Sequence, residues 1–412
     1  MMVWVNSTHT QWAAGQGFFR SGRISTDHVT VNYVYDCGSV GSTARCKAEI
    51  RTYTSGDGAP SKVDMVFLSH FDQDHVNRVK DLVAAIPVER FVIPLVSAPE
   101  RLLALARSLD SREPIDPDGW YASFVVNPRG ALTALPNQAG DAEIIEIPPG
   151  TTPEFADDDV LAAGDVTEPT GAATTWVPPL VTRPARIEAA TRGGRTRPVW
   201  LWETYVLADV TDRQRLFVQA LAQELCVDAE SLAKDIDRTA CVRSLVMNES
   251  RALRKAYEAV STDLNFTSLM LYSGPVNAIG TGNSAKSWRT RHGGVDRAEI
   301  AAWDVRPGWL GTGDAPLNSA GRLKEFGRVF ERHLPNVGTF ALPHHGSRWS
   351  LDPVLLDMFS PPLPACVVSA TTPRYGHPHP ETQTAVHDRG FHLVQVTGDP
   401  RSRWTSSATS WL

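Results

Sequence analysis

The chain of 412 residues lacks the features that mark secreted and membrane-spanning proteins. Its five cysteines are scattered, odd in number and never arranged as CxxC, which argues against a disulfide framework and favours a reducing compartment. The N-terminal MMVWVNSTHTQW has no charged segment followed by an apolar core, so it does not resemble a signal peptide. No run approaches the ~18 apolar residues of a membrane span. We therefore expect a soluble, cytoplasmic protein with no membrane partner.

Positive charge is not in excess, with 40 lysines and arginines against 46 aspartates and glutamates. A formal net charge of -6 argues against a globally basic nucleic-acid binder. It does not exclude a nuclease, because a metal centre carries its own positive charge. One segment, residues 280–297, is locally basic, with lysine and arginine around Trp288. It suits single-stranded nucleic acid by phosphate pairing and base stacking, and it suits a solvated hairpin equally well.

Apolar periodicity predicts layered α/β structure. Residues 28–37 alternate with the period of a strand, and residues 63–70 form a second strand that leads into a helix at 76–86 and a strand at 90–95. Such an order of strand, loop, helix and strand is typical of sheets covered by helices. The pattern returns in the C-terminal third, with strands predicted at 268–274, 338–347, 365–370 and 391–399 and helices at 321–334 and 381–390.

The middle of the chain differs in composition. Residues 150–198 are rich in proline, glycine, threonine and alanine without a clear period, which predicts a long loop or partly disordered insertion. Residues 212–260 are helical by pattern, with Asp228 as a plausible N-cap and no catalytic motif. We expect this part to pack on the main domain, where it recruits a protein partner or shields a cleft. The predicted organisation is one domain over residues 1–412, with a loop-then-helix insertion at 150–262 and a second, basic loop insertion at 273–308.

The sequence LSHFDQDHVN, residues 68–77, is dense in groups that bind metals and protons. In an extended loop, His70, Asp72 and Asp74 point the same way, while His75 turns toward a second centre. Later strands end in further histidine pairs and a Gly-Asp turn. Imidazole nitrogen and carboxylate oxygen suit zinc, manganese or iron, whereas packing alone explains such repeated clusters poorly. The later groups are His344 with His345, His377 with His379, and Asp314.

These residues also carry a family resemblance. HxDxDH at 70–75 is similar to the HxHxDH signature of the metallo-β-lactamase superfamily, with Asp72 in place of the middle histidine. More narrowly, the chain resembles the metallo-β-lactamase-like domain of the ComEC-type DNA-uptake proteins and their stand-alone relatives. The resemblance implies a four-layer αββα sandwich with the metal site at one sheet edge. The matching pieces, in family order, are GQG at 15–17, YDCGS at 35–39, SHFDQDH at 69–75, NFTSLML at 265–271, TGDAP at 312–316, LPHHGS at 342–347 and RYGHPHPE at 374–381.

The resemblance implies a role for each ligand. His70 and Asp72 would hold a first metal, and Asp74 and His75 a second, with Asp314 as the bridge. His345 would complete the second site, His344 would be a ligand, an outer partner or a proton donor, and Asp36 would brace the loop.

One departure weakens the first site. The wider superfamily has a further histidine ligand where this chain has Asn265 and Ser268. We therefore expect one tight and one loose site, filled by one or two ions of Zn²⁺ or Mn²⁺, with the carboxylate-rich loose site preferring manganese or magnesium.

The loop RYGHPHPE predicts substrate contacts. Its prolines limit where His377 and His379 point, and Arg374 and Tyr375 add a phosphate-pairing fork and a hydroxyl. We expect His377 to protonate the leaving alkoxide or to bind a non-bridging oxygen. The alternative is that both rings cap a turn. Ser347 would likewise bind phosphate or cap the next segment.

Together these features predict a metal-dependent hydrolase, foremost a phosphodiesterase or nuclease acting on DNA, with Asp74 or Asp314 orienting the attacking hydroxide. Two alternatives stay open. The first is a hydrolase of a small ester, lactone, thioester or amide, because metal polarisation also activates carbonyl groups. The second is a binding or scaffold protein that keeps the fold without turnover.

Overall fold

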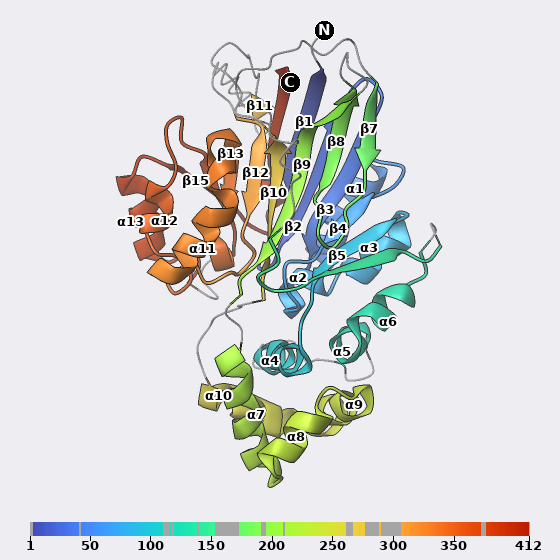
Figure 1. Ribbon diagram of the computed structural model, residues 1–412, viewed down its shortest axis with the longest axis vertical. Helices are drawn as coiled ribbons and strands as arrows, with labels where there is room; N and C mark the ends of the chain where they lie inside the picture. The colour runs from blue at the N-terminus through green and yellow to red at the C-terminus, as the bar shows by residue number, and fades with distance from the viewer. Residues whose placement is uncertain are drawn as a thin grey trace.

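The computed structural model contains two β-sheets that lie face to face, with helices outside them (Figure 1). Within the residues that the structure describes, each sheet has eight strands and mixes parallel with antiparallel pairs. This arrangement confirms the predicted αββα sandwich. The described residues are 3–40, 43–109, 116, 119–137, 140–152, 173–190, 195–208, 211–260, 267–276, 288–289, 306–371 and 376–411.

The first sheet joins both ends of the chain to the strand that precedes the HxDxDH motif. Its strands β3 to β6 are parallel neighbours, whereas β16, β1, β2 and β3 pair antiparallel. The strand order is β11 (Trp288–Arg289), β16 (Trp404–Trp411), β1 (Trp4–Gln11), β2 (Phe19–Ser25), β3 (Thr30–Cys37), β4 (Met65–Phe67), β5 (Arg90–Pro94) and β6 (Glu143–Ile147).

The second sheet carries the later histidine clusters. Strands β12 to β15 are parallel, and β10, β9, β8 and β7 extend the sheet antiparallel. The strand order is β15 (His392–Val396), β14 (Ala365–Ser369), β13 (Val337–Ala341), β12 (Gly308–Gly311), β10 (Leu269–Pro275), β9 (Thr196–Val206), β8 (Ala185–Ala190) and β7 (Thr174–Val177).

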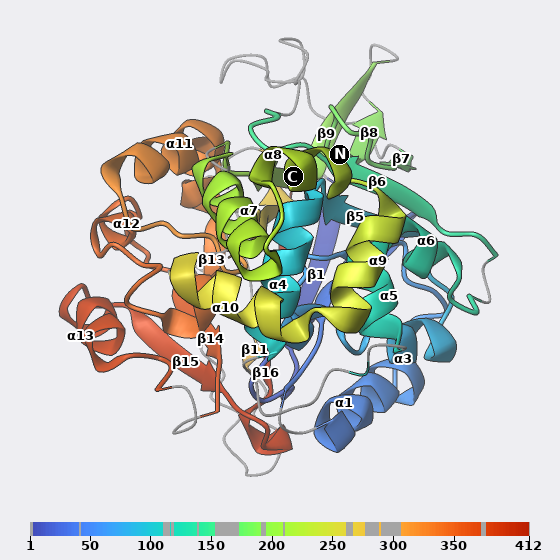
Figure 2. The same ribbon diagram turned by 90° about the horizontal axis from the view of Figure 1, so that it is seen from below.

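Helices cover both outer faces and form a further layer below the sandwich (Figures 1 and 2). They are α1 (Thr43–Ser55), α2 (Gln73–Val76), α3 (Val79–Ala85), α4 (Ala98–Leu109), α5 (Trp120–Val126), α6 (Pro128–Thr133), α7 (Thr211–Leu225), α8 (Ala229–Asp235), α9 (Thr239–Asn248), α10 (Ser250–Val260), α11 (Ala320–Phe330), α12 (Val354–Asp357) and α13 (Pro380–Asp388), with 3₁₀ turns η2 (Glu331–Asn336), η3 (Pro343–Gly346) and η4 (Pro400–Ser402).

Large aromatic side chains fill the space between the sheets. Tyr33 and Phe67 from the first sheet meet Trp202 and Trp309 from the second in one buried cluster. Side chains alternate across a strand, so each sheet offers one face to this core and the other to its helices. The inner core thus fixes the two sheets, and their ends, relative to each other.

Helices α7 to α10, here called the helical module (residues 211–260), lie against α4 and α5 (Figure 2). Leu105 of α4, Phe217 of α7 and Leu253 of α10 belong to one buried cluster that continues to the outer face of the first sheet. Asp228 caps α8, as expected, by accepting a hydrogen bond of 2.8 Å from the backbone N–H of Ser231. The module is therefore built onto the sandwich through a shared apolar core.

The prediction of a loop throughout 150–198 is wrong for part of that range. Strands β7 and β8 and the first residues of β9 form the edge of the second sheet. The strand period was hidden because two of the three buried side chains of β8, Ala185 and Ala189, are small and contrast little with the other face. Residues 153–172 lie outside the described residues.

Two other predictions meet only part of the described chain. Most of the basic segment 280–297 lies outside it, apart from the short strand β11. Among the described residues, no helix combines the length and the apolar character needed to cross a bilayer.

Candidate metal centre

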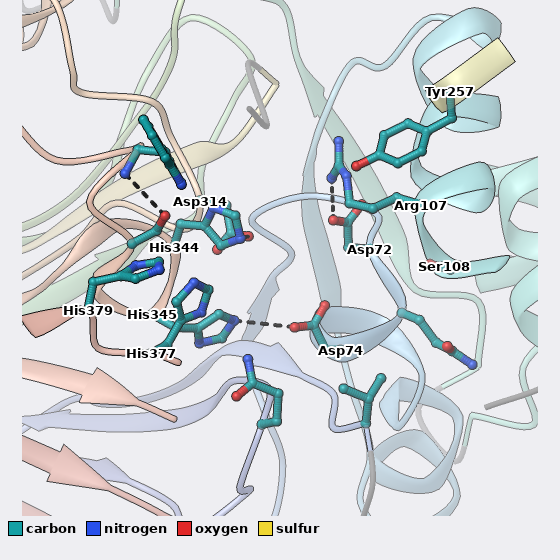
Figure 3. Close-up of a pocket in the computed structure, with 15 residues that line it drawn as sticks. Asp72, Asp74, Arg107, Ser108, Tyr257, Asp314, His344, His345, His377 and His379 are labelled. Atoms are coloured by element: carbon teal, nitrogen blue, oxygen red, sulfur yellow. Dashed lines mark hydrogen bonds and ion pairs between the residues drawn. The ribbon is translucent and has the colours of Figure 1, made fainter. Parts of the chain in front are cut away.

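Loops that carry several of the predicted ligands come together around one pocket (Figure 3). His70 follows β4, whose neighbours β3 and β5 run parallel to it. Asp314 follows β12 and His345 follows β13, which are parallel neighbours in the second sheet. Parallel strands place their carboxyl ends at the same edge, so residues distant in sequence converge there.

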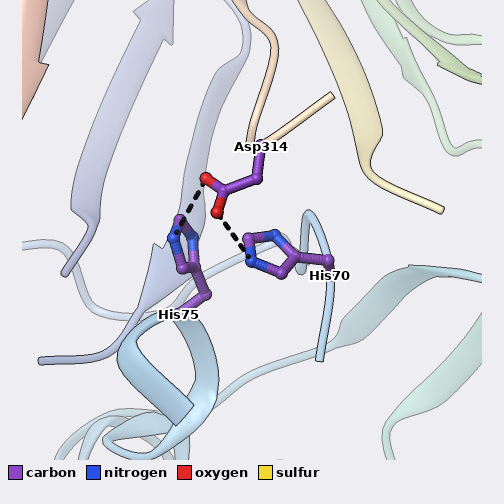
Figure 4. A group of neighbouring side chains, drawn as sticks. All are labelled: His70, His75 and Asp314. Atoms are coloured by element: carbon purple, nitrogen blue, oxygen red, sulfur yellow. Dashed lines mark ion pairs between the residues drawn. The ribbon is translucent and has the colours of Figure 1, made fainter. Parts of the chain in front are cut away.

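Side-chain atoms from these loops approach one another closely. Nε2 of His70 lies 3.4 Å from Oδ2 of Asp314, and Nε2 of His75 lies 3.5 Å from Oδ1 of the same carboxylate (Figure 4). Nε2 of His345 lies 3.3 Å from both Nε2 of His75 and Oδ2 of Asp74. Asp314 therefore occupies the position expected of a bridging ligand between the two histidines of the first motif.

The outer nitrogens of two imidazoles are already used by acceptors. Nδ1 of His75 lies 2.8 Å from a carboxylate oxygen of Asp36, and Nδ1 of His345 lies 2.6 Å from the carbonyl oxygen of Ser369. Both nitrogens must donate a proton to these acceptors, which leaves each Nε2 as a lone-pair atom when the ring is neutral. Metal-ligating histidines are oriented by partners of this kind.

Two lone-pair atoms that face each other at 3.3 Å need either a proton or a metal ion between them. Ligand atoms of Asp74, His75 and His345 all lie within 4.8 Å of one another, and so do those of His70, His75 and Asp314. Nitrogen and oxygen donors in such groups suit zinc and manganese. The residues present therefore fit a divalent ion.

Asp36 braces the motif, as the resemblance implied. Its carboxylate accepts hydrogen bonds of 2.6 Å from the backbone N–H and from the hydroxyl of Ser69. Ser69 Oγ lies 2.8 Å from Nδ1 of His70 and, having donated its own proton to Asp36, accepts from that ring. One buried carboxylate thus fixes His70 and His75 with their Nε2 atoms toward the centre.

Close backbone approach explains two glycines of the motifs. Gly313, in TGDAP, has φ of 53°, and a Cβ atom there would lie 2.8 Å from Cβ of Ser69. A Cβ atom on Gly38, in YDCGS, would lie 2.4 Å from the carbonyl oxygen of Asp74. Both glycines therefore let neighbouring loops pack directly against the metal-binding segment.

Burial and charge act in opposite directions on the titratable groups. Burial would lower the pKa of His70, but the carboxylates of Asp314 and Asp72 raise it to about 9. Burial would raise the pKa of Asp314, but His344, His70 and His75 hold it well below its ordinary value. The site thus attracts cationic charge, which protons supply when a metal ion does not.

A pocket of about 370 Å³ opens beside this centre and has two chemically different walls (Figure 3). His344, His377 and His379 lie on one wall. Arg107 at the end of α4 and Tyr257 of α10 lie on the other. The helical module therefore contributes directly to the wall of the candidate site.

The histidines on the first wall differ in their contacts. Nδ1 of His344 lies 3.2 Å from Oγ of Ser350, and Nδ1 of His379 accepts a hydrogen bond of 3.2 Å from the backbone N–H of Arg348. Nδ1 of His377 is buried and has no hydrogen-bond partner among the described residues. Burial, together with His345 and His344, lowers the pKa of His377 to about 3. The turn-capping alternative thus applies to His379 and not to His377.

Ser347 satisfies one of its two predicted roles. Its buried Oγ accepts a hydrogen bond of 3.3 Å from the backbone N–H of Trp349, so it caps the following segment. The predicted phosphate-binding residues Arg374 and Tyr375, and the departure position Asn265, lie outside the described residues. Catalytic roles for Asp74, His344 and His377 stay predictions.

Several pocket residues lie outside the predicted set, and Arg107 and Trp349 are the two with chemistry suited to a substrate. Arg107 donates a hydrogen bond to Asp72, itself one of a group with His70 and Asp74 whose ligand atoms cluster. Trp349 lines the pocket and is 53% exposed. Neither residue belongs to a predicted motif. The available signals were the position of Arg107 in the last turn of α4 and the position of Trp349 two residues after LPHHGS.

Comparison with known proteins supports the assignment of a metal centre. Residues 27–209 match the family model of the metallo-beta-lactamase superfamily, so the chain contains a domain of that superfamily. The match includes the HxDxDH motif and implies a metal-dependent hydrolase in general, with divalent ions that the His and Asp clusters fit.

Searches for individual relatives gave less. No curated protein matches the chain. Among the 27 matching solved chains is a metallo-beta-lactamase from Cronobacter sakazakii mutated in its HARLDQ motif. It is 13% identical, with 60% of this chain and 92% of that chain covered and a TM-score of 0.20.

Proposed function

From the metallo-beta-lactamase superfamily domain at residues 27–209, we propose that this protein is a metal-dependent phosphodiesterase that cleaves DNA, and a relative of the ComEC-type nucleases. The observation that carries the choice of substrate is Trp349. Among the Phe, Trp and Tyr residues whose exposure the structure describes, it is the one exposed side chain, and it lies at the pocket that holds the candidate metal ligands. A nucleic-acid base can stack on such a ring, whereas a small ester or lactone has no aromatic plane to stack there.

Trp349 is held ready for stacking. The guanidinium of Arg348 lies 4.5 Å from the centre of the indole, and Arg348 is itself paired with Glu381. The carbonyl oxygen of Trp349 accepts a hydrogen bond of 2.6 Å from Asn318. One face of the indole is thus covered by a cation and the backbone is anchored, so binding a base costs little ordering.

The ligands of one or two ions are proposed to come from His70, Asp72, Asp74, His75, Asp314 and His345, whose atoms form three overlapping groups. A Zn²⁺ or Mn²⁺ ion bound among them would supply a Lewis acid and lower the pKa of water near the phosphodiester. Asp74 is the least buried of the central carboxylates, with a side chain 20% exposed, and it faces the pocket. We assign to it the orientation of the attacking water.

In this proposal His377 and His344 lie where the leaving group departs and assist its departure. Their rings are 5.3 Å apart and line the pocket across from Asp74. The low pKa of His377 keeps it neutral in the free protein, and the negative charge of a bound phosphodiester favours its protonated form. It then donates a proton to the departing alkoxide, with Ser347, His379, Arg374 and Tyr375 proposed to bind substrate oxygens.

The proposal includes a cytoplasmic location, supported by cysteines that are all free. It also includes a nucleic-acid substrate as the main partner. We also propose that a protein partner binds the 150–262 insertion, because the helical module adds surface to the sandwich.

The test is hydrolysis by purified protein loaded with Mn²⁺ or Zn²⁺. Single-stranded DNA, double-stranded DNA and bis(p-nitrophenyl) phosphate should be cleaved, and EDTA should stop the reaction. Carboxyl esters and nitrocefin serve as the competing substrates. Efficient cleavage of nitrocefin or esters, with DNA left intact, would overturn the proposal in favour of carbonyl chemistry.

A further inference from the structure

Asp72 differs from the other acids of the motif because a resident cation already pairs with it. Nη1 of Arg107 donates a hydrogen bond to Oδ2 of Asp72. The same oxygen lies 3.7 Å from Nε2 of His70, which makes it the atom that would face a first metal ion. The carboxylate that the family resemblance assigns to a metal is therefore committed to a guanidinium.

Several contacts hold Arg107 in this position. Its guanidinium carbon lies 5.9 Å from the ring centre of Tyr257, which belongs to α10 of the helical module. On the next residue, Ser108 Oγ lies 3.0 Å from the hydroxyl of Tyr121, and that hydroxyl donates a hydrogen bond of 3.0 Å to the carbonyl of Phe71. The end of α4 is thus fastened to the backbone immediately before Asp72.

A fixed guanidinium and a second divalent ion compete for this place. A guanidinium and a divalent ion that share one carboxylate repel each other strongly in a partly buried site, and the single negative charge of Asp72 cannot fully compensate both. The second group of ligands, Asp74, His75 and His345, includes no arginine and keeps its inner nitrogens facing each other. The two halves of the site therefore have different cations available to them.

Arg107 also faces the substrate. Its side chain is 23% exposed and lines the pocket together with Asp74 and Trp349. A guanidinium is always charged near neutral pH and offers a planar fork of donors that matches two oxygens of a phosphate.

We infer that Arg107 takes the place of a second metal ion: held by Asp72 and the helical module, its guanidinium binds a non-bridging phosphate oxygen beside a single ion at Asp74, His75 and His345. This inference rests on the proposed function for its substrate. It also gives the helical module a role, which is to position a substrate-binding residue.

The number of ions is tested without any activity measurement. Protein saturated with Mn²⁺ or Zn²⁺ and freed of loosely bound metal should retain one equivalent by elemental analysis. Asp72→Asn should retain the same equivalent, whereas Asp74→Asn should lose it. Two retained equivalents in the unaltered protein, one of them lost in Asp72→Asn, would overturn the inference.

The phosphate contact is tested by the salt dependence of binding to an oligothymidylate with non-hydrolysable phosphorothioate linkages. Arg107→Ala should weaken binding about tenfold or more and reduce the slope of log Kd against log salt by about 0.7, the value for one lost contact on a single strand. Arg107→Lys should keep the slope while binding more weakly. Arg101→Ala, on the same helix but outside the pocket lining, is the matched control and should change neither.

An unchanged slope in folded Arg107→Ala would overturn the phosphate contact. Should Arg107→Ala not fold, Arg107→Lys still decides, because unaltered affinity in that variant contradicts recognition by the fork. If the unaltered protein neither binds nor cleaves DNA, the proposed function fails, while the count of metal equivalents still judges the pairing of Arg107 with Asp72.

Discussion

Two buried clusters in this protein contain histidine and carboxylate, and they differ in what neutralises the acid. On the second sheet, Glu203 accepts bonds of 2.7 and 2.8 Å from Arg332 and lies 2.5 Å from Nε2 of His333. At the candidate metal centre, the carboxylates of Asp74 and Asp314 have mainly imidazoles around them. The first cluster is complete with its own cation, whereas the second collects cationic charge from outside.

The comparison teaches that histidine and acid side by side do not define a metal site. The useful distinction is whether a permanently charged group already satisfies the carboxylate. Asp72 is the intermediate case, since it belongs to the metal-binding motif and yet pairs with Arg107. By this criterion we expect Glu203 to be structural, Asp74 to be a metal ligand and Asp72 to orient Arg107.

The largest expected effect is at the metal centre. Asp74→Ala or His75→Ala should lower kcat/KM by at least about 10³-fold, because the several kcal/mol of transition-state stabilisation that a metal ion supplies is lost with the ion. Elemental analysis should show metal loss, and circular dichroism should show a retained fold. Asp57→Ala, an exposed acid, is the control. Full activity in a metal-free variant would show that the assignment of the ligands is wrong.

The Glu203 cluster should respond in the opposite way. Glu203→Gln leaves Arg332 without its counter-charge and Nε2 of His333 without its carboxylate partner, which should lower the free energy of unfolding by about 1–3 kcal/mol. Metal content and kcat should stay unchanged, because no ion depends on this carboxylate. Urea denaturation with parallel elemental analysis checks both halves of the statement. Loss of metal from Glu203→Gln would break the distinction between the two clusters.

His377 separates turnover from metal binding within the pocket itself. His377→Ala should lower kcat by about 10²-fold, the usual contribution of a positioned proton donor, while metal content changes little. His387→Ala, an exposed histidine on α13 outside the pocket lining, should leave kcat unaltered. Kinetics in His377→Ala equal to those of the unaltered protein would assign His377 to structure.

Most of the sandwich could be predicted because its strands are locally legible. Val29, Val31, Tyr33 and Tyr35 recur at every second position around β3, and the buried strand β5 is almost continuously apolar. Strands β7 and β8 escaped prediction because β7 is short and buries only Thr174, and because alanines on the buried side of β8 give little contrast between its faces. Prediction thus succeeded where burial is strong and failed where the sheet ends.

The residues of the candidate site likewise divide into those that could be predicted from the sequence and those that could not. The first motif could be recognised because its ligands lie within six residues, and the positions of Asp314 and His345 followed from the resemblance. Arg107 could not be found, because its role depends on how α4 packs against α2, α5 and the helical module. Contacts between elements so far apart in sequence leave no local pattern.

The smallest expected effect concerns the rim of the pocket, where Trp349 exposes an aromatic ring on which a base can stack. Trp349→Ala should raise KM for single-stranded DNA about tenfold, as one lost base stack is worth 1–3 kcal/mol, and should leave metal content and KM for an abasic oligomer unchanged. Trp349→Phe should lie between. Val354→Ala, 54% exposed on the neighbouring α12 and outside the pocket lining, is the control. Equal losses on abasic and base-containing DNA would mean that Trp349 shapes the pocket and does not stack on a base.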